Sequence, residues 1–157
     1  MSICLELMRY EPSLQQSLFE FTDACFAELG KKFEPDGRHL FYRNIPENFD
    51  SFFCLVDGGP DGNGCTVKGS VGIKRIDSDT CELKALYVSQ ELRGQGFGQR
   101  LLSTAINSAR DLGYRRIVLD SMSQYVDARR LYEKTGFVDI ERYNDNPYAD
   151  VFMGLDL

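Results

Sequence analysis

The feature that most constrains the fold is a glycine-rich turn, LRGQGFGQRLL, at residues 92–102. Glycines occupy positions 94, 96 and 98, directly after an apolar strand-like run and directly before a strongly amphipathic helical pattern. Within a helix a glycine costs about 1 kcal/mol relative to alanine, so the cluster indicates a backbone requirement that a β-carbon would obstruct. The glycines form either a tight strand-to-helix turn or a place where an anion approaches the backbone.

The elements on both sides of this turn predict a parallel strand pair. Residues 80–88 (TCELKALYV) are typical of a strand, and residues 99–113 (QRLLSTAINSARDLG) place apolar side chains at helical spacing. Residues 115–121 (RRIVLDS) form a second, apolar strand. A strand, a helix and a strand in this order have the form of a βαβ crossover.

The rest of the chain alternates between helical and strand periodicity. Ile3, Leu5 and Leu7 alternate with other residues in a first strand, and a helical pattern over residues 12–29 ends at Gly30. Residues 31–50 predict an irregular segment. The other expected elements are an antiparallel meander over residues 51–57, 65–77 and 80–88, a helix at 126–136, and strands at 137–143 and 149–157. This order predicts a single α+β domain over residues 1–157 around one sheet.

Composition and charge exclude several classes of protein. The formal charge is −6, from 18 basic and 24 acidic residues, which argues against a nucleic-acid binder with a basic stripe. The five cysteines show neither a CxxC pair nor a Cys/His pattern, so we expect reduced core or strand residues and no metal site. The N-terminal residues carry charges and no long apolar run, which predicts a cytoplasmic protein without a membrane partner.

The spacing of the glycines separates several kinds of phosphate site. A dinucleotide fingerprint needs GxGxxG and a Walker loop needs GK[ST], whereas this chain has GxGxG followed by Gln99 and Arg100. What remains is a run of backbone N–H groups at a positive helix N-terminus, which can hold a phosphate or pyrophosphate. Arg93 and Arg100 add positive charge on either side.

Three segments in the correct order resemble the GNAT family of N-acetyltransferases. They are ELKALYV, then RGQGFG, which fits the family signature [Q/R]-x-x-G-x-[G/A], and ARRLYEKTGF, together covering residues 82–137. The closing RYNDNPYADVFMGLDL is similar to a bacterial branch of small single-domain members. The resemblance implies a mostly antiparallel twisted sheet of about six to seven strands, flanked by about four helices, with a splayed strand pair at the coenzyme site.

The resemblance also implies acetyl-coenzyme A (acetyl-CoA) as the acyl donor. In this family the pantetheine arm lies beside the strand that precedes the glycine loop, and the loop holds the pyrophosphate. The matching residues of this chain are Leu86, Tyr87, Val88, Arg93, Gly94, Gln95, Gly96, Phe97, Gly98, Gln99 and Arg100. The glycines would then be explained by the coenzyme that lies against them.

Two residues match the catalytic positions of the family. Tyr132 in LYEK would protonate the leaving thiolate, although a tyrosine that only packs on the sheet fits the same position. Glu82 would deprotonate the amine through water, although an exposed glutamate paired with Lys84 is an equal alternative. Strict alternation places Glu82 on the same strand face as Leu86 and Val88, and a backbone N–H near Val88 would meet the oxyanion.

The sequence gives a less specific signal for the residues that would bind the acceptor. The family resemblance places Phe33, Tyr42, Tyr143, Asn146 and Tyr148 in an acceptor pocket, although these aromatic segments could equally cap the sheet edge. Tyr125 stands where many members have an asparagine that contacts the pantetheine, so it would pack on the cofactor or narrow the tunnel. The only histidine, His39, is interpreted as incidental.

Three functions are considered for a chain with this resemblance. The first is an N-acetyltransferase that moves an acetyl group from acetyl-CoA to a primary amine of a small molecule or amino acid, by direct attack in a ternary complex. The alternatives are a non-catalytic module that senses acyl-CoA or binds a partner, and a protein or peptide N-acetyltransferase. A homodimer is common in the family, and no apolar stripe of this sequence requires one.

Overall fold

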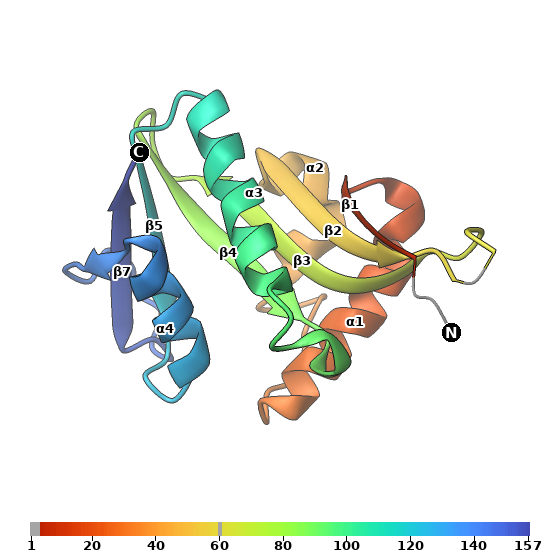
Figure 1. Ribbon diagram of the computed structural model, residues 1–157. Helices are drawn as coiled ribbons and strands as arrows, with labels where there is room; N and C mark the ends of the chain where they lie inside the picture. Colours follow the sequence, from red (N-terminus) through yellow and green to blue (C-terminus); the bar gives the residue numbers. More distant parts are fainter. Residues whose placement is uncertain (1–3, 60) are drawn as a thin grey trace.

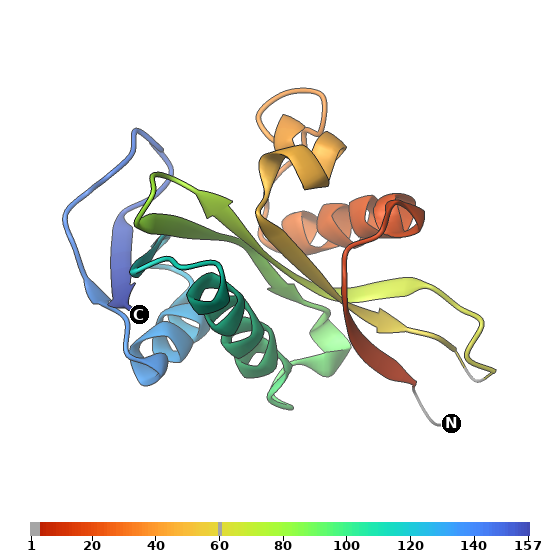
Figure 2. The ribbon, with the colours of Figure 1, turned by 90° about the horizontal axis from the view of Figure 1, so that it is seen from above.

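A computed structural model describes residues 4–59 and 61–157. A seven-stranded sheet has the strand order β1-β2-β3-β4-β5-β7-β6, and helices cover both of its faces. Helices α1 and α2 lie on one face, and α3 and α4 lie on the other (Figures 1 and 2). The predicted fold class is therefore confirmed, with seven strands and four α-helices in a mixed α/β arrangement among the described residues.

The first half of the chain forms an antiparallel meander. Its strands are β1 (Leu5–Arg9), β2 (Ser51–Asp57), β3 (Thr66–Arg75) and β4 (Thr80–Val88). Helix α1 (Gln15–Glu28) follows a 3-10 turn at Pro12–Leu14, and Gly30 ends this segment with φ of 70°. The irregular segment contains a 3-10 turn at Leu40–Asn44 and the short helix α2 (Ile45–Asn48). Ile3 of the expected first strand lies outside the described residues.

The second half begins with the predicted βαβ crossover. The crossover leads from β4 through α3 (Phe97–Asp111) to β5 (Arg116–Ser121), with a 3-10 turn at Gln90–Leu92 before the helix. The elements that follow are α4 (Val126–Thr135), β6 (Val138–Asp139) and β7 (Val151–Asp156). The strand expected over residues 137–143 is wrong in its length, because β6 contains only two residues. Beyond Ile140 the chain leaves the sheet, since the Arg142 guanidinium binds the carbonyl oxygens of the following loop.

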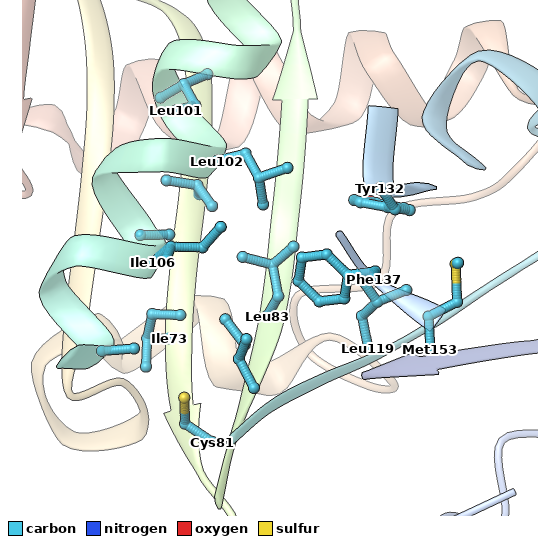
Figure 3. Close-up of a cluster of buried hydrophobic side chains, with 14 of the residues drawn as sticks. Ile73, Cys81, Leu83, Leu101, Leu102, Ile106, Leu119, Tyr132, Phe137 and Met153 are labelled. Atoms are coloured by element: carbon cyan, nitrogen blue, oxygen red, sulfur yellow. The ribbon is translucent and has the colours of Figure 1, made fainter. Parts of the chain in front are cut away.

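Two clusters of buried side chains stabilise the sheet, one on each face. Figure 3 shows the cluster under α3, in which Leu102 and Ile106 pack toward Leu83. Cys25, Cys54 and Cys81 are buried, and burial raises the pKa of each thiol to about 12, so they stay protonated at neutral pH. The expectation of core or strand cysteines is wrong for two others, because Cys4 and Cys65 are exposed outside the strands.

Strands β4 and β5 diverge, as the resemblance implies. They pair in parallel only where Thr80–Glu82 lies beside residues 116–118, and no further pair joins them among the described residues. Figure 1 shows the two strands separating from this point. The other edge of β4 remains paired with β3 as far as Val88. The C-terminal half of β4 therefore has one free backbone edge.

A β-bulge in β4 changes which face each side chain occupies. Lys84 lies opposite Gly72 and Tyr87 lies opposite Ser70, so Ala85 and Leu86 together face one residue of β3. Ala85 has φ of 59°, and its carbonyl oxygen accepts a 2.6 Å hydrogen bond from the Ser70 hydroxyl. One extra residue shifts the alternation of a strand by one position.

The predicted face of Glu82 is wrong because of this bulge. Leu86 and Val88 pack with the cluster under α3, together with Leu83, which alternates with Glu82. Ala85 and Tyr87 pack with the cluster on the α1 face instead. Glu82 therefore shares its face with Lys84, Ala85 and Tyr87.

Candidate functional site

A cleft of about 1290 Å³ opens where β4 and β5 separate. Its walls come from β4, β5, the end of α1 with the segment that follows it, the start of α4, and the loop at residues 143–149. Single small-molecule pockets usually measure about 300 to 1,000 Å³, so this cleft can hold more than one small ligand. The free edge of β4 runs along the cleft.

The glycine-rich turn lies at the N-terminus of α3. Gly94 and Gly96 have φ of 76° and 86°, a left-handed conformation that favours glycine, and a Cβ on either would enter open space. A Cβ on Gly98 would lie 3.4 Å from Leu131 Cδ2, an ordinary van der Waals contact, so packing does not require a glycine at this position. The first helical hydrogen bond joins Arg100 N–H to the Gly96 carbonyl, and the N–H groups of the preceding helical turn remain available to an anion.

The two arginines that flank the glycines have different surroundings. Arg93 donates a 3.1 Å hydrogen bond to the Val88 carbonyl and forms a 2.7 Å ion pair with Glu28, so it joins the turn to β4 and α1. Arg93 also lines the cleft. Arg100 is exposed, and its guanidinium lies 5.7 Å from the centroid of the Phe97 ring.

The other side chains of the turn make local contacts. The Gln95 amide donates to the Glu91 carbonyl at 3.1 Å, and the Gln99 amide donates to the Ser103 hydroxyl at 3.2 Å. Both contacts lie within the turn or the first part of α3. The backbone of the turn, rather than these amides, therefore remains free to receive a ligand.

Glu82 is buried, with 7% of its surface exposed. Its Oε2 accepts a 2.5 Å hydrogen bond from the Tyr143 hydroxyl and a 3.5 Å contact from the Asn144 amide. Its Oε1 lies 3.5 Å from Lys84 Nζ. The structure thus combines features of both sequence interpretations, because Glu82 is paired with Lys84 and is nevertheless buried in the cleft.

A second carboxylate lies close to Glu82. Asp120, on β5, accepts hydrogen bonds from the side-chain amides of Asn144 at 2.6 Å and Asn146 at 3.3 Å. Asn144 therefore contacts both carboxylates across the separating strands. Sequence reasoning did not select Asp120 or Asn144; the available signal was a carboxylate that interrupts the apolar run of RRIVLDS.

Tyrosine hydroxyls surround the same part of the cleft. Burial and then the charge of Glu82 raise the pKa of Tyr143 far above its usual value, so its hydroxyl stays a donor. Tyr132 is buried on α4, and burial followed by the charge of Asp120 raises its pKa to about 12. Its ring lies 5.8 Å from that of Phe137, so the packing role and the acid role remain compatible with its position.

Tyr125 carries a buried hydroxyl without a hydrogen-bond partner among the described residues. It precedes α4 and lines the cleft, and Lys31 Nζ lies 4.8 Å from the centroid of its ring. Buried hydroxyls are normally hydrogen-bonded in native proteins. This unsatisfied hydroxyl fits a site that receives a polar ligand.

The structure brings together four of the five residues expected at the acceptor. Tyr42, Tyr143, Asn146 and Tyr148 line the cleft, but Phe33 does not. Phe33 lies in the core on the α1 face, with its ring 5.2 Å from that of Tyr42 and 5.6 Å from that of Phe26. Its position therefore supports the cleft wall from behind.

His39 also lines the cleft. Its Nδ1 accepts a 3.0 Å hydrogen bond from the Glu34 N–H, and its ring packs against Phe26. Burial and the charge of Arg38 lower its pKa, so the imidazole is neutral at neutral pH. These contacts agree with a structural role in the irregular segment.

Arg142 holds the loop that carries Tyr143, Asn144 and Asn146. Its guanidinium donates to the carbonyl oxygens of Asn144 at 3.4 Å, Asn146 at 3.0 Å and Ala149 at 3.0 Å. It also lies 4.6 Å from the centroid of the Phe152 ring on β7. One side chain thus fixes the loop relative to the sheet.

Replacing Arg142 with lysine should loosen this loop, because an ammonium cannot contact three separated carbonyl oxygens from one planar fork. We expect amide hydrogen exchange over residues 143–149 to accelerate by about tenfold or more. Arg115→Lys is the matched control, since Arg115 is 83% exposed and forms only a 4.0 Å ion pair. Unchanged exchange in Arg142→Lys would show that other contacts hold the loop.

In the described parts of the chain, no cluster of three or more histidine, cysteine, aspartate or glutamate residues is arranged to bind a metal ion. No helix within residues 4–59 and 61–157 has the length and hydropathy needed to span a membrane.

Comparison with known sequences gives one family. The model of the acetyltransferase (GNAT) family matches residues 16–137. The similar curated proteins include N-acetyltransferase C1271.07c of Schizosaccharomyces pombe, 40% identical over 49% of this chain and 48% of its own length. They also include N-acetyltransferase YjgM of Escherichia coli, 35% identical over 48% of this chain and 47% of its own. The matches thus span about half the length of these relatives.

Comparison with solved structures extends over the whole fold. An acetyltransferase of the GNAT family from Staphylococcus aureus superposes with a TM-score of 0.85 at 21% identity, over 98% of this chain and 99% of its own. YncA from Salmonella typhimurium, solved with its cofactor acetyl-CoA, has a TM-score of 0.72 at 20% identity, over 99% of this chain and 94% of its own. At 21% and 20% identity, these likenesses show that the chain shares the fold of the two proteins.

Proposed function

Because the chain belongs to the GNAT family of acetyltransferases, we propose that it transfers an acetyl group from acetyl-CoA to the primary amine of a small molecule or amino acid, by direct attack in a ternary complex. The observation that carries this proposal is the bulged, free edge of β4. It leads from the glycine-rich N-terminus of α3 into a cleft that contains Glu82 and Tyr132.

The residues present fit the coenzyme. The turn at residues 94–100 offers backbone N–H groups beside open space, which suits a pyrophosphate, and the free edge at residues 86–88 suits the amide groups of a pantetheine arm. The unsatisfied Tyr125 hydroxyl supplies a further polar contact. Acetyl-CoA, when bound, supplies the thioester whose acetyl group is transferred. The structure of YncA with acetyl-CoA supports this assignment by likeness of fold.

Proton movement is assigned to two residues of the cleft. We assign Glu82 as the group that accepts the proton of the amine, through water, with Tyr143 and Lys84 holding its two oxygens. We assign Tyr132 as the group that donates a proton to the departing thiolate. With its pKa raised to about 12, Tyr132 remains protonated over the neutral range and can act as a donor. A backbone N–H near Val88 remains our prediction for the oxyanion contact.

A thiol-release assay tests the proposal. The chain is mixed with acetyl-CoA and a panel of amines, amino acids and peptides, and free thiol is measured together with the melting temperature in the presence of coenzyme A. Thiol release with a primary amine supports the enzyme. Stabilisation by coenzyme A without thiol release across the panel would instead favour a sensing module. Exclusive release with peptides would favour a peptide N-acetyltransferase.

The cytoplasmic location and a homodimer remain predictions.

Tyr132→Phe tests the assigned acid. Removal of the proton donor should lower kcat about 100-fold and leave coenzyme affinity almost unchanged, because the ring still packs on Phe137. An ordinary tyrosine has a pKa of 10.0, whereas the pKa of Tyr132 is raised to about 12. The unmodified chain should therefore lose activity through deprotonation of Tyr132 only at a pH higher than an ordinary tyrosine would give.

Tyr114→Phe is the control for this substitution. Tyr114 donates to Asp50 outside the cleft, so its loss should lower the melting temperature without lowering kcat. Equal turnover of Tyr132→Phe and the unmodified chain would assign Tyr132 to packing alone.

A further inference from the structure

Three cations line the cleft from one segment of the chain. Lys31, Lys32 and Arg38 line it from the segment after α1, and no ion pair within 4.0 Å engages these three among the described residues. The same segment contributes one carboxylate, Glu34. Across the cleft, β5 contributes Asp120. In a chain with a formal charge of −6, this concentration of cations on one wall favours a ligand that carries an anionic group.

The ion pair of Glu82 and Lys84 lies between these walls. Both side chains project from the α1 face of β4, their charged atoms are 3.5 Å apart, and their side chains are 10% and 28% exposed. Lys84 Nζ also lies 5.5 Å from the centroid of the Phe41 ring. A ligand in the cleft therefore meets one negative and one positive group within a few ångströms.

An α-amino acid matches this pair. Its ammonium and carboxylate are attached to one carbon, so the ammonium can lie at Glu82 while the carboxylate lies at Lys84. A simple amine would leave Lys84 without a ligand contact. A polyamine that placed a second cation at Lys84 would meet like charge there.

We propose that the acceptor is an α-amino acid whose amine lies at Glu82 and whose carboxylate binds Lys84. This inference rests on the proposed acetyltransferase function and narrows its substrate class. In each turnover the amine nitrogen forms an amide bond to the acetyl carbon and the carbon–sulfur bond breaks. The ammonium loses two protons, of which one ends on the coenzyme thiol and one in solvent.

Matched acceptors test the class of substrate. Thiol release is measured with the common amino acids, and each amino acid that reacts is compared with its decarboxylated amine and with its α-amide. The amine is more basic than the amino acid and the amide is less basic, so an effect of basicity would move the two analogues in opposite directions. Loss of the carboxylate contact should raise KM for both analogues by about tenfold or more.

Lys84→Met tests the assigned contact. We expect KM for the amino acid to rise by about tenfold or more and KM for the amide to change less than about twofold. Lys74→Met is the matched control, because Lys74 lies opposite Glu82 on β3, with Nζ 5.3 Å from the centroid of the same Phe41 ring, and does not line the cleft. The control should leave both KM values unchanged.

Three results would overturn the inference. Simple amines or amides that react as well as amino acids would remove the need for a carboxylate. Equal effects of Lys84→Met on amino acid and amide would mean that Lys84 acts through Glu82. A rise in the KM for acetyl-CoA alone in Lys84→Met would assign Lys84 to the coenzyme. Absence of thiol release with every acceptor, with coenzyme binding intact, would reject the proposed function itself.

Discussion

Glu82→Gln is expected to lower kcat/KM by about 100-fold to 1,000-fold, because glutamine cannot accept the proton of the attacking amine. The amide retains nearly the same shape, and its oxygen can still accept the hydrogen bond from the Tyr143 hydroxyl. The fold should therefore survive, with a melting temperature close to that of the unmodified chain. Steady-state kinetics with a reactive acceptor, over a range of pH, measure the effect.

A second carboxylate provides the control for this variant. Asp127 lines the cleft, but its side chain is fully exposed and it only forms a 4.0 Å ion pair with Arg130. Asp127→Asn should keep kcat/KM within about twofold, because exposed ion pairs of this kind contribute little. If Glu82→Gln also retained most of its activity, Glu82 would be a structural partner of Tyr143 and not the base.

Gly96→Val should reduce affinity for coenzyme A by about 100-fold or more. Gly96 has φ of 86°, which a β-branched residue adopts only with strain of about 1–3 kcal/mol. The new side chain would also extend into the open space beside the N–H groups of the first helical turn. Calorimetric titration with coenzyme A, which needs no acceptor, measures the loss.

The other end of the same helix offers a matched control. Gly113 has φ of 89°, and a Cβ there would also enter open space. Gly113→Val should therefore lower the free energy of unfolding by a similar amount but leave coenzyme affinity intact. Equal affinity of Gly96→Val and the unmodified chain would contradict the assignment of the turn as the pyrophosphate site.

Local patterns predicted most of the elements. The strands at residues 51–57, 65–77 and 80–88 and the helices at residues 99–113 and 126–136 agree with the structure to within a few positions, because each is a strand-like or helical run of residues that ends at turn residues. The strand expected at residues 137–143 is shorter in the structure, because the Arg142 side chain binds carbonyl oxygens of the loop that follows it, in competition with the sheet. That competition depends on how the loop folds back.

The candidate site was predictable only in part. The turn at residues 94–100 and Tyr132 were found from their motifs, since each is encoded in a short contiguous segment. Asp120 and Asn144 were missed because they come close to Glu82 only when β5 and the closing loop fold beside β4. Phe33 was expected at the acceptor because the family resemblance places the segment after the first helix there, but the structure buries its side chain in the core.

The sequence by itself determined the fold class, the family and the position of the glycine turn, because periodicity and motif spacing are local properties of the chain. Only the tertiary structure decided the face of Glu82. The bulge at Ala85 inserts one residue into the pairing of β4 with β3, which reverses the alternation that a straight strand would keep. Glu82 and Lys84 precede the bulge and share a face by simple alternation, whereas the bulge brings Ala85 and Tyr87, in place of Leu86 and Val88, onto that face.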